Sequence, residues 1–326
     1  MTDQSSGAGT IISFSDRYRS RVLSLWNDVL PLDALTHDVF ESRILLDENF
    51  DAETFPLLVK DDRLVGFALG MHPRRMPLGD ADPDGDRCWI TAFGIDPGFS
   101  LAEAGRVLLT ELENRFRTLG KKECRISTYP PGYVTPGIDQ KAYKPLLDFF
   151  LGNGYTKAHE AISMDAAIVR FEVSPKIRGQ EKALRDGGIE IRPFQREDLL
   201  KFLDFLERSM PTDWVRVQRK NLRALSTGQF KTDQITVVAK GDEIIGYCQF
   251  EGSHFGPFGV AEAYQGKGIG TVLLARTLER MRNMGEHVAW VMWTDDQAAK
   301  VYQKFGFTET RRFSILTKNL AGTGNG

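Results

Sequence analysis

Residues 258–274 decide the fold of this 326-residue chain, and they read Phe258-Gly259-Val260-Ala261-Glu262-Ala263-Tyr264-Gln265-Gly266-Lys267-Gly268-Ile269-Gly270-Thr271-Val272-Leu273-Leu274. The first three residues predict the end of an apolar strand, and the residues from about Gly270 predict an amphipathic helix. The three glycines between them permit a sharp turn and place no Cβ in the way of a ligand. Backbone N–H groups at such a helix start, with Lys267 beside them, favour a phosphate or pyrophosphate. The alternative is a glycine-rich turn without a ligand.

A second motif narrows this interpretation. The loop is not the dinucleotide-binding fingerprint, because it opens with Gln265 and no acidic residue closes a second strand at the expected distance. Gln265-x-x-Gly268-x-Gly270 resembles the acyl-coenzyme A loop of the GNAT N-acetyltransferases. Downstream, Asp295-x-x-Ala298-x-x-x-Tyr302-x-x-x-Gly306-Phe307 is similar to that family's second signature, a helix that leads into a Gly-Phe strand start. Both motifs occur in the family's order and at about its spacing.

The chain also repeats itself. Residues 56–67 align without a gap with residues 236–247, and both segments predict a hairpin with a polar turn. Residues 93–109 align with residues 258–274, and Gly154-Tyr155 with Gly306-Phe307. The first copy carries extra residues, predicted within Met71–Arg87 and from Tyr129 to Ala142. We interpret the pattern as an internal duplication.

The duplication sets the expected organisation of the chain. We expect a disordered leader (1–10), a degenerate GNAT-like domain (11–171), a linker (172–188), a catalytic GNAT domain (189–320) and a flexible tail (321–326). A strand near Ala161–Val169 is expected to close the first copy. The second copy reads β-α-α-β-β-β-α-β-α-β, which is similar to the GNAT fold. The predicted class is therefore α/β (α+β), with two tandem domains that each contain a twisted mixed β-sheet flanked by helices.

Only the second copy retains the residues of the motif. In the first copy, Leu101 and Glu103 stand where the loop has Gly266 and Gly268, and Phe150 aligns with Tyr302. A carboxylate beside a pyrophosphate in a partly buried site costs on the order of several kcal/mol. The first copy is therefore predicted to have lost its ligand site.

The resemblance implies a donor and a set of donor-binding residues. The donor would be acetyl-coenzyme A, with its pyrophosphate on the loop amides and its pantetheine along the edge of the preceding strand. A backbone N–H near Gly259 or Val260 would polarise the acetyl carbonyl. The predicted binding residues are Phe258, Gly259, Val260, Gln265, Gly266, Lys267, Gly268, Ile269, Gly270, Thr271, Asp295 and Ala298. No metal is expected.

The resemblance likewise implies catalytic residues. Tyr302 would protonate the leaving thiolate, since an unperturbed tyrosine is protonated at neutral pH; its alternative is a core aromatic beside Val301 and Phe305. Glu251 and His254 are the candidates for the base that receives the amine's proton, and the alternative for each is a polar strand-end residue. Asp295 departs from the family's usual Asn and is expected to cap a helix.

The acceptor is less clearly indicated. Asp213-Trp214, Trp290, Trp293 and the turn from Glu251 to His254 would form an aromatic and acidic rim if they converge. Such a rim suits a cationic or sugar-like amine, and some tandem GNAT proteins, such as the mycothiol synthases, act on amino sugars or thiol-linked amino sugars. An amino sugar such as glucosamine is therefore the first expectation.

Composition excludes several other classes. The content of 41% hydrophobic and 26% charged residues is that of a soluble globular protein, and a formal net charge of -2 argues against a nucleic-acid partner. There is no apolar run long enough to span a membrane and no signal-peptide pattern, and the three cysteines lack metal spacing. We expect a cytoplasmic monomer or homodimer that acetylates a small-molecule amine. The alternatives are a protein or peptide N-acetyltransferase, transfer of a larger acyl group, a non-catalytic acyl-coenzyme A sensor and an interaction module.

Overall fold

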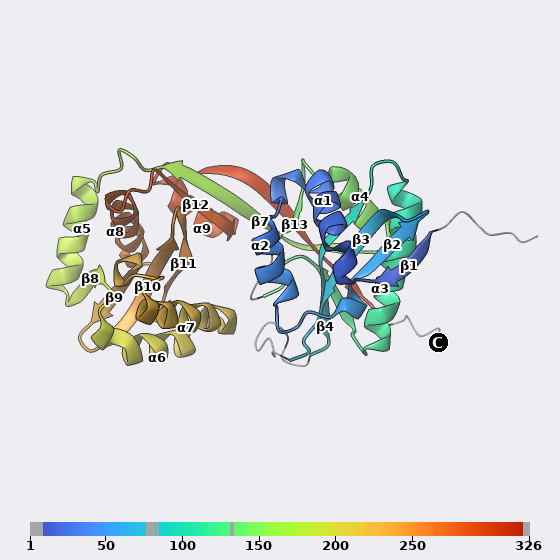
Figure 1. The fold of residues 1–326 in the computed structure, drawn as a ribbon. Coiled ribbons are helices and arrows are strands. Elements are labelled where there is room, and N and C mark those ends of the chain that lie inside the picture. Colours follow the sequence, from blue (N-terminus) through green and yellow to red (C-terminus); the bar gives the residue numbers. More distant parts are fainter. Residues whose placement is uncertain (1–8, 76–81, 83–84, 131–133, 322–326) are drawn as a thin grey trace, which may run out of the picture. The chain divides into compact units, whose positions relative to one another are not determined.

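The computed structural model describes residues 9–75, 82, 85–130 and 134–321. The chain divides into two compact units (Figure 1). The first unit contains Met1–Ala161 and Arg312–Gly326, and the second contains Ile162–Arg311.

The first unit contains a mixed sheet in the order β1-β2-β3-β4-β5-β13. Its only parallel pairing among the described residues is between β4 and β5, from Arg87 opposite Glu123 to Ile90 opposite Ile126. Its elements are β1 (Thr10–Ser13), α1 (Arg19–Val29), α2 (His37–Phe40), β2 (Pro56–Lys60), β3 (Arg63–Met71), β4 (Arg87–Ile95), α3 (Arg106–Thr118), β5 (Glu123–Ile126), β6 (Ile138–Asp139), α4 (Lys144–Gly152) and most of β13 (Thr308–Asn319).

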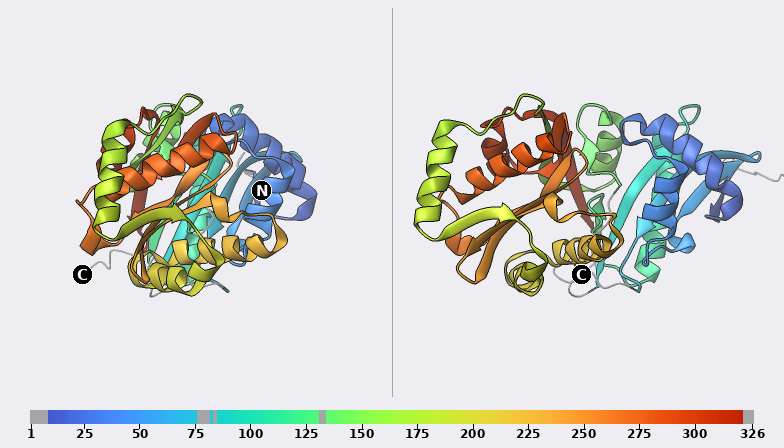
Figure 2. Two further views of the ribbon diagram at one scale, coloured as in Figure 1. Left: turned by 90° about the vertical axis from the view of Figure 1, so that its left-hand side faces the viewer. Right: turned by 60° about the vertical axis from the view of Figure 1, so that its left-hand side comes forward.

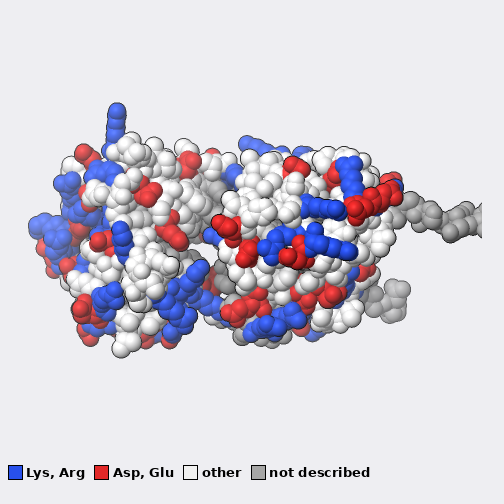
Figure 3. Space-filling view, viewed as in Figure 1, with Lys and Arg blue, Asp and Glu red and all other residues white. Residues whose placement is uncertain are grey.

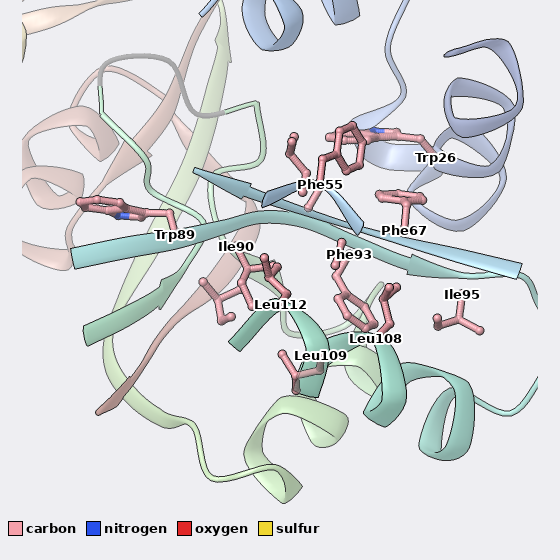
Figure 4. Close-up of a cluster of buried hydrophobic side chains, with 14 of the residues drawn as sticks. Trp26, Phe55, Phe67, Trp89, Ile90, Phe93, Ile95, Leu108, Leu109 and Leu112 are labelled. Atoms are coloured by element: carbon pink, nitrogen blue, oxygen red, sulfur yellow. The ribbon is translucent and has the colours of Figure 1, made fainter. Parts of the chain in front are cut away.

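Apolar side chains cover both faces of this first sheet, which explains why β3 and β4 read as nearly unbroken apolar runs. On one face Trp26 of α1 stacks on Phe67 with ring centroids 5.5 Å apart. On the other face, leucines of α3 such as Leu108 and Leu112 pack beneath the strands (Figure 4). Both layers belong to one buried cluster.

The second unit contains a sheet in the order β7-β12-β11-β10-β9-β8. Helices α6 and α7 cover one face and α8 the other, with α5 packed on α8 (Figure 2). The elements are the end of β7 (Thr156–Ala167), α5 (Pro175–Asp186), β8 (Ile189–Pro193), α6 (Leu199–Ser209), α7 (Thr212–Thr227), β9 (Ile235–Lys240), β10 (Glu243–Glu251), β11 (His254–Val260), α8 (Ile269–Asn283), β12 (Val288–Thr294) and α9 (Asp296–Gln303).

The two copies exchange their closing strands, and this corrects one expectation. The strand expected near Ala161–Val169 exists as β7, but it pairs with β12 of the second unit and does not close the first. The last strand of the second copy, β13, pairs instead with β5 of the first unit. Each edge strand is thus completed by the other copy, which a duplicated sequence permits because both copies offer equivalent edges. The predicted end of the first copy at residue 171 and the predicted start of the second copy at residue 189 remain predictions.

The structure describes the predicted linker but little of the expected leader and tail. Residues 1–8 and 322–326, most of the expected leader and tail, lie outside the described residues, and Thr10 already begins β1. The first predicted insertion, within Met71–Arg87, lies partly outside them too. The predicted linker contains a 12-residue helix, α5, with Ser174 as its N-cap. Glu181 of α5 forms an ion pair with Arg276 of α8, so the segment packs into the second unit.

A buried ion pair fastens the exchanged strand β13 to the first unit. The Lys318 ammonium lies 2.7 Å and 2.9 Å from the two carboxylate oxygens of Glu113, which is 4% exposed, and it also donates to the carbonyl of Asn153. Arg117 and Tyr155 also donate to this carboxylate. The pair therefore links β13 to α3.

Lys318→Met is expected to lower the free energy of unfolding of the first unit by about 2 kcal/mol. It leaves a buried carboxylate with fewer partners, and Arg117 offsets part of the loss. Chemical denaturation followed by tryptophan fluorescence measures this, with the exposed Lys304→Met as control. Adding Glu113→Gln to Lys318→Met should recover part of the loss; equal stability of Lys318→Met and the control would contradict the role given to this pair.

Candidate active site

The strand-to-helix turn of the second unit has the geometry expected of an anion cradle. β11 ends at Val260 and α8 begins at Ile269, one residue before the predicted start. Gly266 and Gly268 have φ of 74° and 79°, in the left-handed region that favours glycine. Gly268 is the N-cap of α8, and no side chain caps this helix. The first N–H groups of α8 are therefore available to a ligand.

Two side chains of this turn donate hydrogen bonds to the turn's own backbone carbonyls. Gln265 donates to the carbonyl of Val260 at 3.0 Å, and Lys267 donates to the carbonyl of Ala263 at 3.0 Å. The Gln265 N–H is already bonded to the carbonyl of Glu262. The Lys267 and Lys240 ammoniums each lie 5.0 Å from the ring centroid of Tyr264. These contacts order the turn and bring two cations to its outer side.

The strand that leads into the turn has an open edge. β11 pairs in parallel with β12 where His254 lies opposite Trp290, and among the described residues the pairing goes no further. On its other side β11 pairs with β10 as far as Val260, with one register shift between Phe255 and Phe258. The edge from Gly256 to Val260 therefore presents backbone groups beside a strand that has diverged, as β-augmentation by an extended ligand requires.

Tyr302 lies beside this edge, in the core of the second unit. It is 5% exposed, and its ring contacts those of Phe255, Phe258 and Phe307, with centroids 5.2, 6.2 and 5.8 Å away. Burial raises the pKa of its hydroxyl well above the ordinary value, and a hydrogen bond with Thr294 opposes this only in part. The Tyr302 ring therefore packs among core aromatics, and its contact with Phe258 places it next to the motif strand.

Glu251 and His254 face each other across a tight turn. They are register partners at the end of the β10–β11 hairpin, where Gly252 has φ of 54°. The Glu251 side chain is exposed, whereas His254 is partly buried with its ring centroid 4.4 Å from that of Trp290. Trp290 also donates to the hydroxyl of Ser253 at 3.2 Å. The turn therefore brings one carboxylate, one imidazole and one indole together.

The remaining predicted residues have structural contacts. The Asp295 carboxylate accepts from the N–H of Ala298 at 2.7 Å, so Asp295 caps α9 as expected. The Trp293 side chain is 37% exposed, whereas the Trp290 side chain is partly buried against His254. Trp214 packs on Tyr247 and over Gly259, on the face of the sheet that α6 and α7 cover.

Met210 is a residue of this region that the motifs did not indicate. A Cβ placed on Gly259 would lie 2.6 Å from the Met210 sulfur and 3.3 Å from Trp214. The sequence did contain one signal, because a glycine inside a strand often marks a close approach by another group. Its partner was not predictable, since Met210 comes from the α6–α7 connection far upstream.

The equivalent place in the first unit is filled. There, Ser100 caps the helix start by accepting from the N–H of Glu103 at 3.3 Å, so a side chain takes the position of a ligand. Beyond Ile90 the diverging edge of β4 is occupied by the second predicted insertion, whose Thr135 hydroxyl donates to the carbonyl of Thr91 at 2.6 Å. A cavity of about 20 Å³ remains beside Phe150, little more than the room one water needs.

The charged surface and the possible metal ligands do not indicate a second kind of site among the described residues. On the face shown in Figure 3, basic and acidic residues are interspersed over both units. Among the described residues no group of His, Cys, Asp and Glu side chains is arranged to hold a metal ion. No helix in the described ranges is long and apolar enough to cross a membrane.

Comparison with known proteins finds a family match in the second unit. Residues 231–309 match the acetyltransferase (GNAT) domain family. A mycothiol acetyltransferase from Corynebacterium efficiens is 32% identical over 103 residues, which are 29% of this chain and 35% of that protein. The chain thus spans about a third of the length of this curated relative.

Solved structures extend the likeness in fold over nearly the whole chain. A fungal GH3 β-N-acetylglucosaminidase, described as containing a GCN5-related glucosamine N-acetyltransferase region, gives a TM-score of 0.80 at 14% identity over 96% of this chain and 38% of that one. A tandem GNAT protein from the clavulanic acid biosynthesis pathway gives 0.60 at 12% over 96% and 99%. A GCN5-related N-acetyltransferase from Sphaerobacter thermophilus gives 0.66 at 14% over 95% of both chains. Residues 231–309 therefore match a GNAT domain, and the fold of the chain is similar to that of these proteins.

Proposed function

We propose that this protein transfers an acetyl group from acetyl-coenzyme A to a primary amine of a small molecule, at one site in the second unit. The observation that carries the proposal is the continuity of the open edge of β11 with the uncapped, left-handed glycine turn at the start of α8. An extended pantetheine chain and a pyrophosphate fit these two features in that order. The first unit, with its edge and helix start filled, supports the second.

The donor is bound largely by backbone. The amides from Gly266 to Thr271 hold the pyrophosphate, with Lys267 supplying charge, and the edge from Phe258 to Val260 pairs with the pantetheine amides. A backbone N–H near Gly259 or Val260 polarises the acetyl carbonyl. Asp295 and Ala298 act indirectly, because the Asp295 cap sets the start of α9, the helix that carries Tyr302.

The transfer occurs by direct attack. The amine nitrogen, having lost a proton to Glu251 or His254, forms a bond to the acetyl carbon. The carbon–sulfur bond then breaks and the thiolate takes the Tyr302 proton, while the second proton that the nitrogen loses as it becomes an amide restores the Tyr302 hydroxyl. A covalent acyl-enzyme on cysteine is disfavoured, because Cys248 is the single cysteine of the second copy and is fully buried. Burial raises the pKa of that thiol to about 12, which keeps it protonated.

The acceptor we propose is an amino sugar such as glucosamine. Supporting this are the aromatic and polar turn formed by His254, Trp290 and Glu251, and two similar proteins whose descriptions name glucosamine and mycothiol acetylation. An indole suits the apolar face of a sugar ring, and a carboxylate suits its ammonium group.

A thiol-release assay tests the proposal. The full chain is incubated with acetyl-coenzyme A and glucosamine, then with other amino sugars and with amine-terminated peptides, and free coenzyme A is titrated. Amine-dependent release with amino sugars, together with the acetylated product by mass spectrometry, is the expected result. Release with peptides only would make this a peptide acetyltransferase. Donor binding without release for any amine would leave a sensor of acyl-coenzyme A.

A further inference from the structure

Apolar side chains line both faces of the sheet at the free edge of β11. On the face covered by α8 and α9, the rings of Phe258, Phe255 and Tyr302 form a continuous cluster. On the face covered by α6 and α7, Met210 and Trp214 lie directly over Gly259, and we call these two side chains the wall. A reactive group placed at this edge therefore meets apolar side chains in both directions.

A methyl group at Gly259 would displace the end of the Met210 side chain. A Cβ at this position would be 2.6 Å from the Met210 sulfur, closer than Cβ contacts in proteins come, and 3.0 Å from its terminal carbon. Trp214, at 3.3 Å from the same point, closes the space beside Met210. Even a substituent of one carbon displaces something on this face.

The position of the wall is held by buried contacts. Tyr247, the register partner of Gly259, is fully buried and meets Trp214 in an edge-on arrangement at 6.4 Å. Further along α7 than Trp214, the side-chain amides of Gln218 and Asn221 both donate to the side-chain oxygen of Gln249 in β10. These neutral hydrogen bonds fix α7 on the sheet, and Met210 is the flexible member of the wall.

We propose that Met210, backed by Trp214, determines the length of the acyl group and restricts the donor to acetyl. The inference rests on the proposed function, which places the acetyl carbonyl near Gly259. For an acyl chain that extends from the Gly259 edge toward the face covered by α6 and α7, each further methylene enters the space that the Met210 side chain fills. Shortening this side chain opens that space, and burial of one methylene there is worth about a fourfold gain in affinity.

The test compares acetyl- and butyryl-coenzyme A as ligands of the full-length protein by calorimetry. Wild type is expected to bind acetyl-coenzyme A and to discriminate against the butyryl thioester. Met210→Ala is expected to raise the butyryl-to-acetyl affinity ratio about fifteenfold, since two methylenes gain a place. Met210→Val, which retains more apolar volume than alanine, is measured in parallel and is expected to shift the ratio in the same direction by less.

The matched control is Leu222→Ala, two turns along α7 from Trp214 and packed on the same core cluster. It loses apolar contacts without opening the edge, so its affinity ratio should equal that of wild type. An unchanged ratio in both Met210 variants, or wild-type protein that binds the two thioesters equally, overturns the inference while leaving the donor site intact. Wild-type protein that binds neither thioester overturns the proposed function as well.

Discussion

Gly268→Glu is expected to weaken acetyl-coenzyme A binding at least a hundredfold. Gly268 has φ of 79° and is the N-cap of α8, so any side chain there is strained and stands among the amides that face the pyrophosphate. A carboxylate adds repulsion of about 4 kcal/mol for charges 4 Å apart at an effective dielectric constant of 20. The first copy carries this change naturally as Glu103. Calorimetric titration measures the loss.

Gly268→Gln separates the two causes. It imposes nearly the same backbone strain and bulk without the negative charge, so it should bind the donor more tightly than Gly268→Glu. Glu103→Gly in the first copy should create no second site, because Ser100 and the Thr135 segment still occupy that place. Unchanged affinity in Gly268→Glu would contradict a pyrophosphate site at this turn.

Tyr302→Phe is expected to lower kcat by about a hundredfold while donor affinity stays within about twofold of wild type. The substitution removes one hydroxyl from a ring that packs on Phe255, Phe258 and Phe307, and it leaves the ring in place. General acid catalysis typically contributes a factor of this size or more. Because burial raises the pKa of Tyr302, its hydroxyl keeps its proton through the neutral range until negative charge develops on the sulfur.

The control for this variant is Tyr155→Phe. Tyr155 is also a buried tyrosine, but it lies in the first unit, where its hydroxyl donates to Glu113. Tyr155→Phe should affect stability and leave kcat unchanged. Equal kcat for Tyr302→Phe and wild type would reduce Tyr302 to a core aromatic, the alternative that its 5% exposure also fits.

Local patterns predicted the elements of the second unit well. The hairpin of β9 and β10, the end of β11 at Val260, the start of α8 and the Asp295 cap all follow from residues near one another in the chain. These features depend on glycines, caps and apolar alternation, which act over a few residues. The mixed sheet and the tandem arrangement were predicted from the resemblance of two motifs to the GNAT family together with the repeat.

The strand exchange was not predictable from such patterns. β7 and β13 are both 12-residue strands that follow equivalent helices, and either could pair with β5 or β12 as far as local sequence decides. The choice depends on contacts far apart in sequence, such as Lys318 with Glu113. The wall of Met210 and Trp214 over Gly259 was missed for the same reason. The loss of the first cradle was predicted from Leu101 and Glu103, whereas the contact of Thr135 with the edge of β4 needed the structure.

The stoichiometry of acetyl-coenzyme A binding tests the central claim most directly. Titration of the intact chain followed by calorimetry should give one site per chain, because the second unit has an open strand edge and an uncapped glycine turn and the first has neither. Two sites per chain would contradict the assignment of the first unit as a support. The absence of any binding would contradict the acetyltransferase itself.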